Sequence, residues 1–219
     1  MTLIKIQKIE FLSPKKRKIF FSNGYSIEIS LKSVYTHNLI EQNEYSLEKF
    51  NLLKKNLEMT AAENIVLQKL KGRKRSENEI ISELKKVNID TETITEIVEK
   101  YRRIGYLNDF DFALSFIKDK VKFGKKPLKI ILYELKKSKI SSDILNRAIE
   151  IFKAENTTTE NDSSESIDIQ SCRLLAEKKK KKYYGFKTNM EIKNKFIKHL
   201  MYRGFSLEII GSCLANMEE

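Results

Sequence analysis

The chain carries one pattern of apolar and polar positions three times, with the spacing of an amphipathic helix. The first copy centres on Leu84 and the second on Leu135, after an interval of 51 residues. The third centres on Leu200, after a longer interval that contains an inserted polar segment. Apolar residues three and four positions apart are typical of helices with one buried face. A unit repeated at this period is typical of blocks that stack and bury a shared core, so we predict tandem helical blocks.

Each block is predicted to contain three helices. The recurring apolar positions are Ile89, Ile94, Ile97 and Val98, then Ile140, Leu145, Ala148 and Ile149, then Phe205, Ile210, Cys213 and Leu214. Capping boxes pair Thr60 with Glu63, Ser76 with Glu79 and Thr188 with Glu191, and Asp90, Ser141 or Ser142, and Ser206 precede the last helix of each block. The predicted helices are 61–72, 76–87 and 91–103, then 109–122, 126–138 and 142–153, then 169–182, 188–202 and 206–217.

Helix ends are predicted from glycines that favour the left-handed conformation, namely Gly105, Gly124, Gly185 and Gly204. Asn88 and Gly204 share a register position in which the second block has Lys139, so that turn is predicted to be strained or to adopt another geometry.

The first forty residues follow a different pattern. Ile4 and Ile6 alternate with polar residues, the phase changes once before Ile9, and residues 25–31 alternate cleanly, as strands with one buried face do. The pair Asn23-Gly24 readily supplies the two positive φ values of a tight hairpin turn. We therefore predict a small antiparallel sheet of two or three strands over 3–31, packed on the helices that follow.

The domain organisation follows from these segments. Residues 1–58 form a small sheet and a short helix starting near Ser46, and 59–108 form the first three-helix repeat. Residues 109–154 form the second repeat, 155–167 an acidic polar linker without periodicity, and 168–219 the third repeat.

Composition agrees with this assignment. Hydrophobic residues make up 41% of the chain, enough for a core, and two prolines with seven glycines favour long helices. The net charge of +12 attracts polyanions, although a lysine-heavy composition alone does not establish nucleic-acid binding.

Cys172 and Cys213 fall in apolar helical positions and are expected as buried thiols in a reducing compartment. Residues 1–5 precede no apolar signal region, and no run of about 18 uncharged apolar residues occurs, so we expect a soluble, cytoplasmic protein.

Several motifs resemble the RecX family, bacterial regulatory proteins that bind the RecA recombinase. The main motif is the repeat junction Gly105-Tyr106-Leu107-Asn108-Asp109-Phe110-Asp111-Phe112-Ala113. Supporting motifs are Arg73-Lys74-Arg75-Ser76, Phe123-Gly124-Lys125-Lys126-Pro127, Leu174-Leu175-Ala176-Glu177-Lys178-Lys179 and Leu200-Met201-Tyr202-Arg203-Gly204-Phe205-Ser206. The resemblance covers about residues 60–217, and the N-terminal sheet with its short helix is similar to the extension of Gram-positive members.

The resemblance implies a mainly α fold of tandem three-helix repeats in an elongated, curved array, with a small N-terminal antiparallel β-sheet. We expect a monomer that contacts single-stranded DNA, with double-stranded DNA as a further candidate. The resemblance implies binding to RecA and the RecA–DNA filament, and restraint of ATP hydrolysis, strand exchange and filament growth. It implies no cofactor and no membrane partner.

Basic residues supply the candidate contacts with RecA or DNA. Arg73, Lys74 and Arg75 occupy the first interhelix turn, and Lys125 with Lys126 occupies the equivalent turn of the second block, which would line one edge of the array with positive charge. The densest patch is Lys178, Lys179, Lys180, Lys181 and Lys182 with Tyr183 and Tyr184, where aromatic rings can stack on bases and amines can meet phosphates. A solvated helix face ending in two packed tyrosines is the alternative. Arg203, near a helix C-terminus, is either a contact or a favourable partner of the helix dipole.

The junction residues are predicted to be structural. Gly105, Tyr106, Leu107, Asp109, Phe112 and Ala113 connect the first two repeats, and Tyr106 and Phe112 are expected to wedge neighbouring blocks together. His37 and His199 lack a second ligand at helical spacing, so we predict no metal site.

Two other functions compete with RecA binding. One is a helical protein that binds DNA directly without RecA, with the last helix of a block in the major groove. The other is an enzyme, for which the sequence offers no phosphate loop, zinc spacing or activated nucleophile. We therefore expect a non-enzymatic binding protein.

Overall fold

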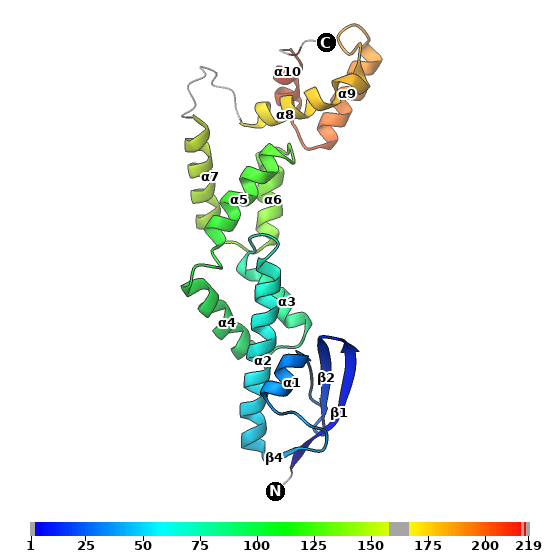
Figure 1. Ribbon diagram of the computed structural model, residues 1–219. Helices are drawn as coiled ribbons and strands as arrows, with labels where there is room; N and C mark the ends of the chain where they lie inside the picture. Colours follow the sequence, from blue (N-terminus) through cyan, green and yellow to red (C-terminus); the bar gives the residue numbers. More distant parts are fainter. Residues whose placement is uncertain (1–2, 158–166, 216, 218–219) are drawn as a thin grey trace. The chain divides into compact units, whose positions relative to one another are not determined.

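The computed structural model describes residues 3–157, 167–215 and 217. It divides into two compact units, Met1–Asn108 (unit 1) and Asp109–Glu219 (unit 2). Helices dominate both units, and a small antiparallel sheet lies in unit 1 (Figure 1). This confirms the prediction of a mainly helical fold with an N-terminal sheet. No helix in the described ranges is long and apolar enough to cross a membrane.

The sheet has four strands in the order β3-β2-β1-β4. They are β1 (Ile4–Ser13), β2 (Lys16–Phe21), β3 (Ser26–Ser30) and β4 (Glu44–Tyr45). A register shift between Ile6 and Lys8 produces the predicted change of phase in β1. The two-residue β4 pairs with the start of β1 and was not predicted, because so short a strand has no detectable period.

The hairpin between β2 and β3 differs from the two-residue turn that we predicted. Gly24 has a φ of 83°, whereas Asn23 does not have a positive φ. The Gly24 N–H donates to the Phe21 carbonyl at 3.0 Å, and the Phe21 N–H donates to the Tyr25 carbonyl at 2.9 Å. The connection is therefore a three-residue loop that ends in a left-handed glycine, a common alternative for hairpins.

Helix α2 (Leu47–Leu70) is one continuous helix of 24 residues. The predicted boundary between residues 58 and 59 falls inside it, and the predicted helix start at Thr60 is wrong. The Thr60 hydroxyl instead donates to the Asn56 carbonyl at 2.9 Å, one turn earlier in the same helix. No glycine or proline interrupts the segment, and Ala62 and Val66 continue its buried face. Nothing in this stretch therefore ends the helix.

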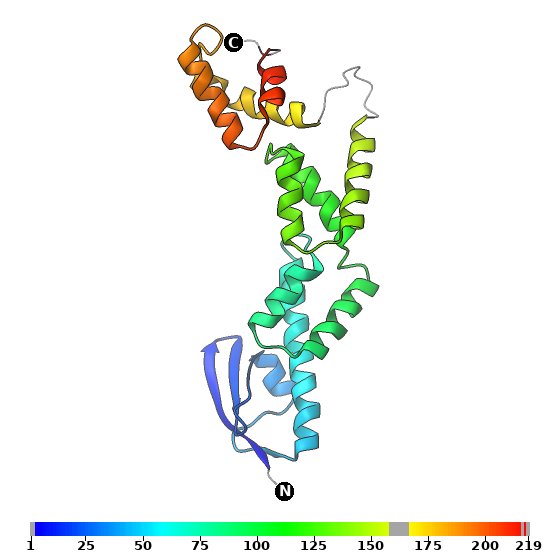
Figure 2. The same cartoon turned by 180° about the vertical axis from the view of Figure 1, so that it is seen from behind.

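The sheet, α2 and the last helix of the first block meet at a buried carboxylate. Glu58 of α2 is 1% exposed and accepts hydrogen bonds from the Tyr25 hydroxyl at 2.9 Å and the Asp90 N–H at 3.1 Å. Burial, and then the charge of Glu58, raise the pKa of Tyr25, which keeps this phenol protonated as a donor. Phe50 of α2 packs against Phe21, with ring centroids 5.1 Å apart. Strands β1 and β2 accordingly lie beside α1 (Leu31–Thr36) and the first part of α2 in both views (Figures 1 and 2).

Three blocks of three α-helices follow the predicted repeat. The first is α2, α3 (Glu77–Lys86) and α4 (Thr91–Arg103). The second is α5 (Asp109–Lys122), α6 (Leu128–Lys137) and α7 (Ser142–Thr157). The third is α8 (Ile167–Lys179), α9 (Met190–Tyr202) and α10 (Leu207–Ala215), with the 3-10 helix η1 (Lys180–Tyr183) after α8.

The recurring apolar positions line the cores. Leu84, Leu135 and Leu200 are all completely buried. The next equivalent positions are buried as well, namely Ile89, Ile140 and Phe205, then Ile94, Leu145 and Ile210, then Ile97, Ala148 and Cys213. The same register extends upstream to Ile80, Ile131 and Phe196. The periodicity in the sequence therefore corresponds to an equivalent core in each block.

Most of the predicted helix starts are confirmed. Ser76 and Glu79 form a reciprocal capping box at α3. Asp90, Ser141 and Ser206 each accept a backbone N–H at the start of the last helix of a block. The prediction for Thr188 is wrong, because Asn189 caps α9 while the Thr188 hydroxyl donates to the Gly185 carbonyl.

The turn between the second and third helices is left-handed in every block. Asn88 and Lys139 both have a φ of 57°, and Gly204 has a φ of 98°. Gly105 and Gly185 also have the expected positive φ, but Gly124 does not. Lys125 is left-handed in its place, with a φ of 47°. A Cβ on Gly124 would lie 2.7 Å from the Lys120 carbonyl oxygen. Glycine is therefore required here because the backbone passes close to that carbonyl, and not because of a positive φ.

The two ends of the predicted linker at 155–167 are helical. Residues 155–157 belong to α7 and Ile167 begins α8, while the remainder, 158–166, lies outside the described residues.

The two cysteines are buried in the core of the third block, as predicted. Cys172 and Cys213 are not joined by a disulfide, and neither has exposed surface. A hydrogen bond with Cys213, followed by burial, raises the pKa of Cys172, so this thiol is held in its neutral form.

The strain at Lys139 leads to a stability prediction. Replacing Lys139 by glycine relieves a left-handed conformation that costs an L-residue roughly 1–2 kcal/mol, offset by the greater freedom of glycine in the unfolded chain. We expect the free energy of unfolding to rise by about 0.5–1 kcal/mol in urea titrations followed by far-UV circular dichroism. Lys139→Ala is the matched control, because it removes the same charge and keeps the Cβ. Equal stability of the two variants would contradict the prediction.

Candidate functional site

The turn of the first block contains one unpaired cation and two paired ones. Arg73 forms an ion pair with Glu79 at 2.6 Å, and the Nε–H of Arg75 donates to the Lys69 carbonyl at 3.3 Å. Lys74 is exposed, and its ammonium group has no ion pair with any described residue. The turn therefore offers Lys74 most directly to a partner.

The equivalent lysines of the second block make contacts within unit 2. The Lys125 ammonium donates to the carbonyl of Leu174 in α8 at 2.7 Å, and Lys126 pairs with Glu134 of α6. In the third block the corresponding positions are Met190 and Glu191, so the basic turn does not recur there. The turn lysines of the second block thus make contacts within unit 2, and the third block has no basic turn at this position.

Five consecutive lysines cover the end of α8 and η1. The predicted helix over 169–182 is wrong at its end, since α8 stops at Lys179 and continues as a 3-10 turn. Lys180 pairs with Glu177 at 3.2 Å. Lys178 and Lys181 are exposed and have no ion pair within the described ranges.

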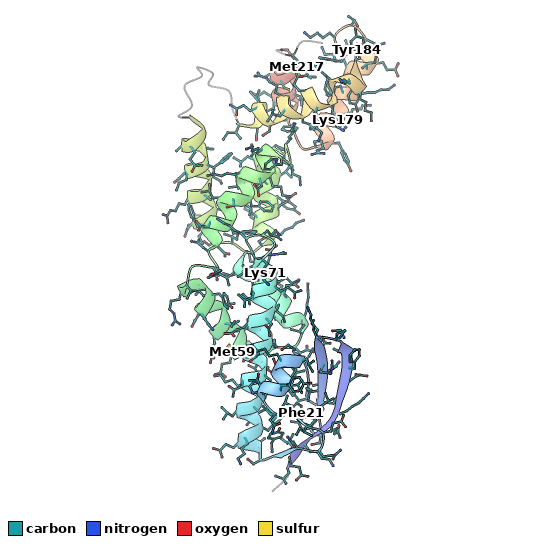
Figure 3. The ribbon with its side chains drawn as sticks, viewed as in Figure 1. Phe21, Met59, Lys71, Lys179, Tyr184 and Met217 are labelled. Atoms are coloured by element: carbon teal, nitrogen blue, oxygen red, sulfur yellow. The ribbon has the colours of Figure 1, made fainter. Side chains whose placement is uncertain are left out.

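The two tyrosines after these lysines have different environments. The Tyr183 ring stacks on Phe196 with centroids 4.6 Å apart and an interplanar angle of 10°. Tyr184 is 76% exposed and lies on the loop between η1 and α9 (Figure 3). Tyr183 therefore belongs to the core edge of its block, and only Tyr184 offers an open ring face beside the lysines.

Arg203 connects the second and third blocks. Its guanidinium donates to the Gly124 carbonyl at 3.0 Å. The neighbouring Gly204 lies so close to α6 that an added Cβ would be 2.6 Å from the Ile130 side chain. At the other side of this junction, the Asp168 carboxylate accepts the Leu128 N–H at 2.7 Å. These contacts between the blocks depend on pairs that are far apart in the sequence.

Three basic side chains converge on His199, which lies on α9. Burial lowers the pKa of His199, and the positive charges of Lys179, Arg203 and Lys182 lower it further. Its Nε2 atom is buried and has no hydrogen-bond partner among the described residues. We call Lys179, Lys182, His199 and Arg203 the His199 cluster. It brings together residues of α8, η1 and the end of α9, which the sequence analysis treated separately.

The junction residues lie where the two units meet in the sequence. Gly105 closes α4 with a φ of 79°, and Leu107 is buried in unit 1. Tyr106 is 62% exposed, and its ring centroid lies 6.2 Å from that of Tyr101. Asp109 begins α5, while Phe112 and Ala113 are buried in the core of the second block. Each side chain thus has a position within its own unit.

The exposed side chains of these sites differ from those of a metal centre. The structure places no group of three or more His, Cys, Asp or Glu side chains in the described ranges where they could hold a metal ion. Lys74, Lys178 and Lys181 present exposed ammonium groups, and Tyr184 presents an exposed ring beside the lysines of η1, which suits an anionic partner.

Comparison with known proteins adds the family. The profile of the third three-helix domain of RecX matches residues 166–214. The regulatory protein RecX of Finegoldia magna is 28% identical over 214 residues, which span 93% of this chain and 95% of the relative. That of Lactobacillus johnsonii is 28% identical over 202 residues, spanning 90% of this chain and 70% of the relative.

The chain is therefore similar to RecX regulatory proteins over nearly its whole length. Two solved structures share its fold. A crystal structure of a regulatory protein RecX aligns with a TM-score of 0.57 and 20% identity over 98% of this chain and all of that chain. RecX from Lactobacillus salivarius aligns with a TM-score of 0.55 and 23% identity over 72% of this chain and 95% of that chain. The three-helix blocks described above are thus a RecX fold.

The His199 cluster gives a titration that tests anion binding. A polyanion bound at the cluster offsets the three cations and favours the imidazolium, so we expect the pKa of His199 to rise when inorganic polyphosphate is added. The chain has only two histidines, so proton NMR resolves the titration, with His37 as the internal reference. Lys179→Gln/Lys182→Gln is expected to raise the pKa without any anion and to weaken the response. An unchanged His199 titration at saturating polyphosphate would rule out anion binding there.

Proposed function

We propose that this chain binds RecA and the RecA–DNA filament and inhibits ATP hydrolysis, strand exchange and filament growth. The observation that carries this proposal is the match to regulatory proteins of the RecX family over nearly the whole chain, including 93% of it against the Finegoldia magna relative. The chain acts by association, as a monomer and without a cofactor or bond-making step.

Multiple weak contacts along the repeats supply the affinity. Rigid blocks that present cations at separate places hold several contacts at once, and each contact raises the effective concentration of the next. Lys74, Lys178 and Lys181 are the best-exposed candidates for these contacts, together with Tyr184 and the His199 cluster. Arg73, Arg75, Lys125, Lys126 and Lys180 contribute positive charge near the surface while also forming the internal contacts described above. The acidic DNA and any acidic surface of RecA are the complementary partners.

Inhibition is tested by measuring ATP hydrolysis by RecA on single-stranded DNA. We expect the rate to fall progressively as this protein is added, because binding along the filament restrains the nucleotide cycle. A rate unchanged at equimolar protein would contradict inhibition. A pull-down with RecA, with and without nucleotide and DNA, then shows whether binding occurs without inhibition.

A charge-reversal experiment tests the lysine patch. Lys178→Glu/Lys181→Glu removes two unpaired cations, and we expect weaker binding to the RecA–DNA filament. The slope of log affinity against log salt concentration is also expected to become shallower. The change is about one unit for each phosphate that the variant no longer neutralises. Lys32→Glu/Lys49→Glu is the matched control, because it changes the same charge at exposed lysines of unit 1. Helicity is compared by circular dichroism. Equally weakened binding in both variants would indicate an effect of net charge alone.

Direct DNA binding without RecA is the competing function. It is separated from the proposal by titrating bare duplex DNA and DNA-free RecA in parallel. Tight, sequence-specific duplex binding together with no RecA contact would replace the proposed function by this alternative.

A further inference from the structure

An exposed tyrosine surrounded by lysines lies on the outer face of α6. Tyr133 is 61% exposed, and the Lys137 ammonium lies 4.6 Å from its ring centroid. Lys129 and Lys136 are exposed one turn before and after it on the same face of the helix. Glu134, the only acid in α6, is directed to Lys126 and Lys120 instead. This face therefore combines an open aromatic ring with three cations and no carboxylate.

The middle helix of the third block carries the same pair of residue types. Tyr202 is 90% exposed, and Lys198 is exposed one turn before it in α9. In the repeat register Tyr133 corresponds to Lys198, and Lys137 corresponds to Tyr202. The aromatic residue and the lysine have thus exchanged places, and the combination is present in both blocks of unit 2.

The first block lacks this combination. Its corresponding positions are Ser82 and Lys86, and Lys86 is paired with Glu83 at 2.6 Å. Because the same fold forms in the first block without an aromatic residue there, the fold does not require a tyrosine on this face. Tyr202 buries almost none of its ring, so packing within the chain does not account for it either.

The chain directly after α9 approaches the start of α6 within unit 2. Arg203 and Gly204, directly after Tyr202, contact Gly124 and Ile130. Ile130 is the neighbour of Lys129 in α6. The end of α9 that carries Tyr202 therefore lies near the start of α6, in the same unit as Tyr133.

We propose that the outer faces of α6 and α9 form a stacking site for single-stranded nucleic acid. Bases stack on the rings of Tyr133 and Tyr202, and phosphates meet the ammonium groups of Lys129, Lys136, Lys137 and Lys198. Such a site is tolerant of sequence, because every base offers a π face, and it selects single strands, because a duplex hides those faces. The concentration of cations without acids favours a nucleic acid over an acidic protein partner. The site deepens the proposed function by naming a DNA contact, and its test does not require RecA.

The sequence contains no tryptophan, which allows a direct test. In Tyr133→Trp the introduced indole is the only one, and oligo(dT) that stacks on it is expected to quench its fluorescence. Tyr35→Trp is the matched control, since Tyr35 is a 74% exposed tyrosine of unit 1. We expect strong quenching at residue 133, little at residue 35, and weaker quenching by a duplex of equal length. Equal quenching at both positions, or equal quenching by the duplex, would overturn the proposal.

Alanine substitutions separate stacking from charge. Tyr133→Ala and Tyr202→Ala are each expected to weaken oligo(dT) binding about tenfold, while Tyr133→Phe and Tyr202→Phe keep the ring and the affinity. Lys129→Gln/Lys136→Gln is expected to reduce the salt dependence and to leave the quenching at saturation unchanged. Unchanged affinity in both alanine variants would refute the site. If oligo(dT) fails to bind while RecA is still inhibited, this inference fails and the proposed function stands.

Discussion

Every block depends on a chain reversal in the left-handed conformation between its second and third helices. Asn88, Lys139 and Gly204 provide it, and the residue that follows each of them is buried in the core. In each block the apolar residues of the last helix and the completely buried leucine of the middle helix belong to the same core. Three different residue types meet this one requirement, at a conformational cost that is lowest for glycine and highest for lysine. The equivalent cores of the three blocks follow from this shared geometry.

The helices were predictable because burial recurs at fixed intervals and because most caps are local. Ser76 and Glu79 are three residues apart, so their pairing is visible in the sequence. Thr60 and Thr188 carry the same signal, but continuous helix formers surround the first and a better cap, Asn189, adjoins the second. Strand β4 and the 3-10 turn η1 are too short to have a period, and tertiary contacts determine them.

The binding surface was predictable only in its charge. Composition shows that lysines and arginines are abundant, but it does not show which of them make contacts within the chain. The partners of Lys125 and Arg203 lie far away in the sequence, and both residues hold the second and third blocks together. Tyr183 proved to be a packing residue because Phe196 folds back against it. The similar surroundings of Tyr133 and Tyr202 could be identified only from the repeat register together with the exposed area of each ring. The sequence alone provides only the register.

The continuity of α2 has a consequence for how unit 1 can change. The first half of α2 carries Phe50, which packs against Phe21 of the sheet, and its second half is the first helix of the first block. Glu58 accepts hydrogen bonds from Tyr25, next to β3, and from Asp90, at the start of α4. Shortening the chain from its N-terminus would therefore expose one side of α2, the helix against which the neighbouring helices also pack. The N-terminal extension and the first block thus share one helix, so a change in either is expected to affect the stability of the other.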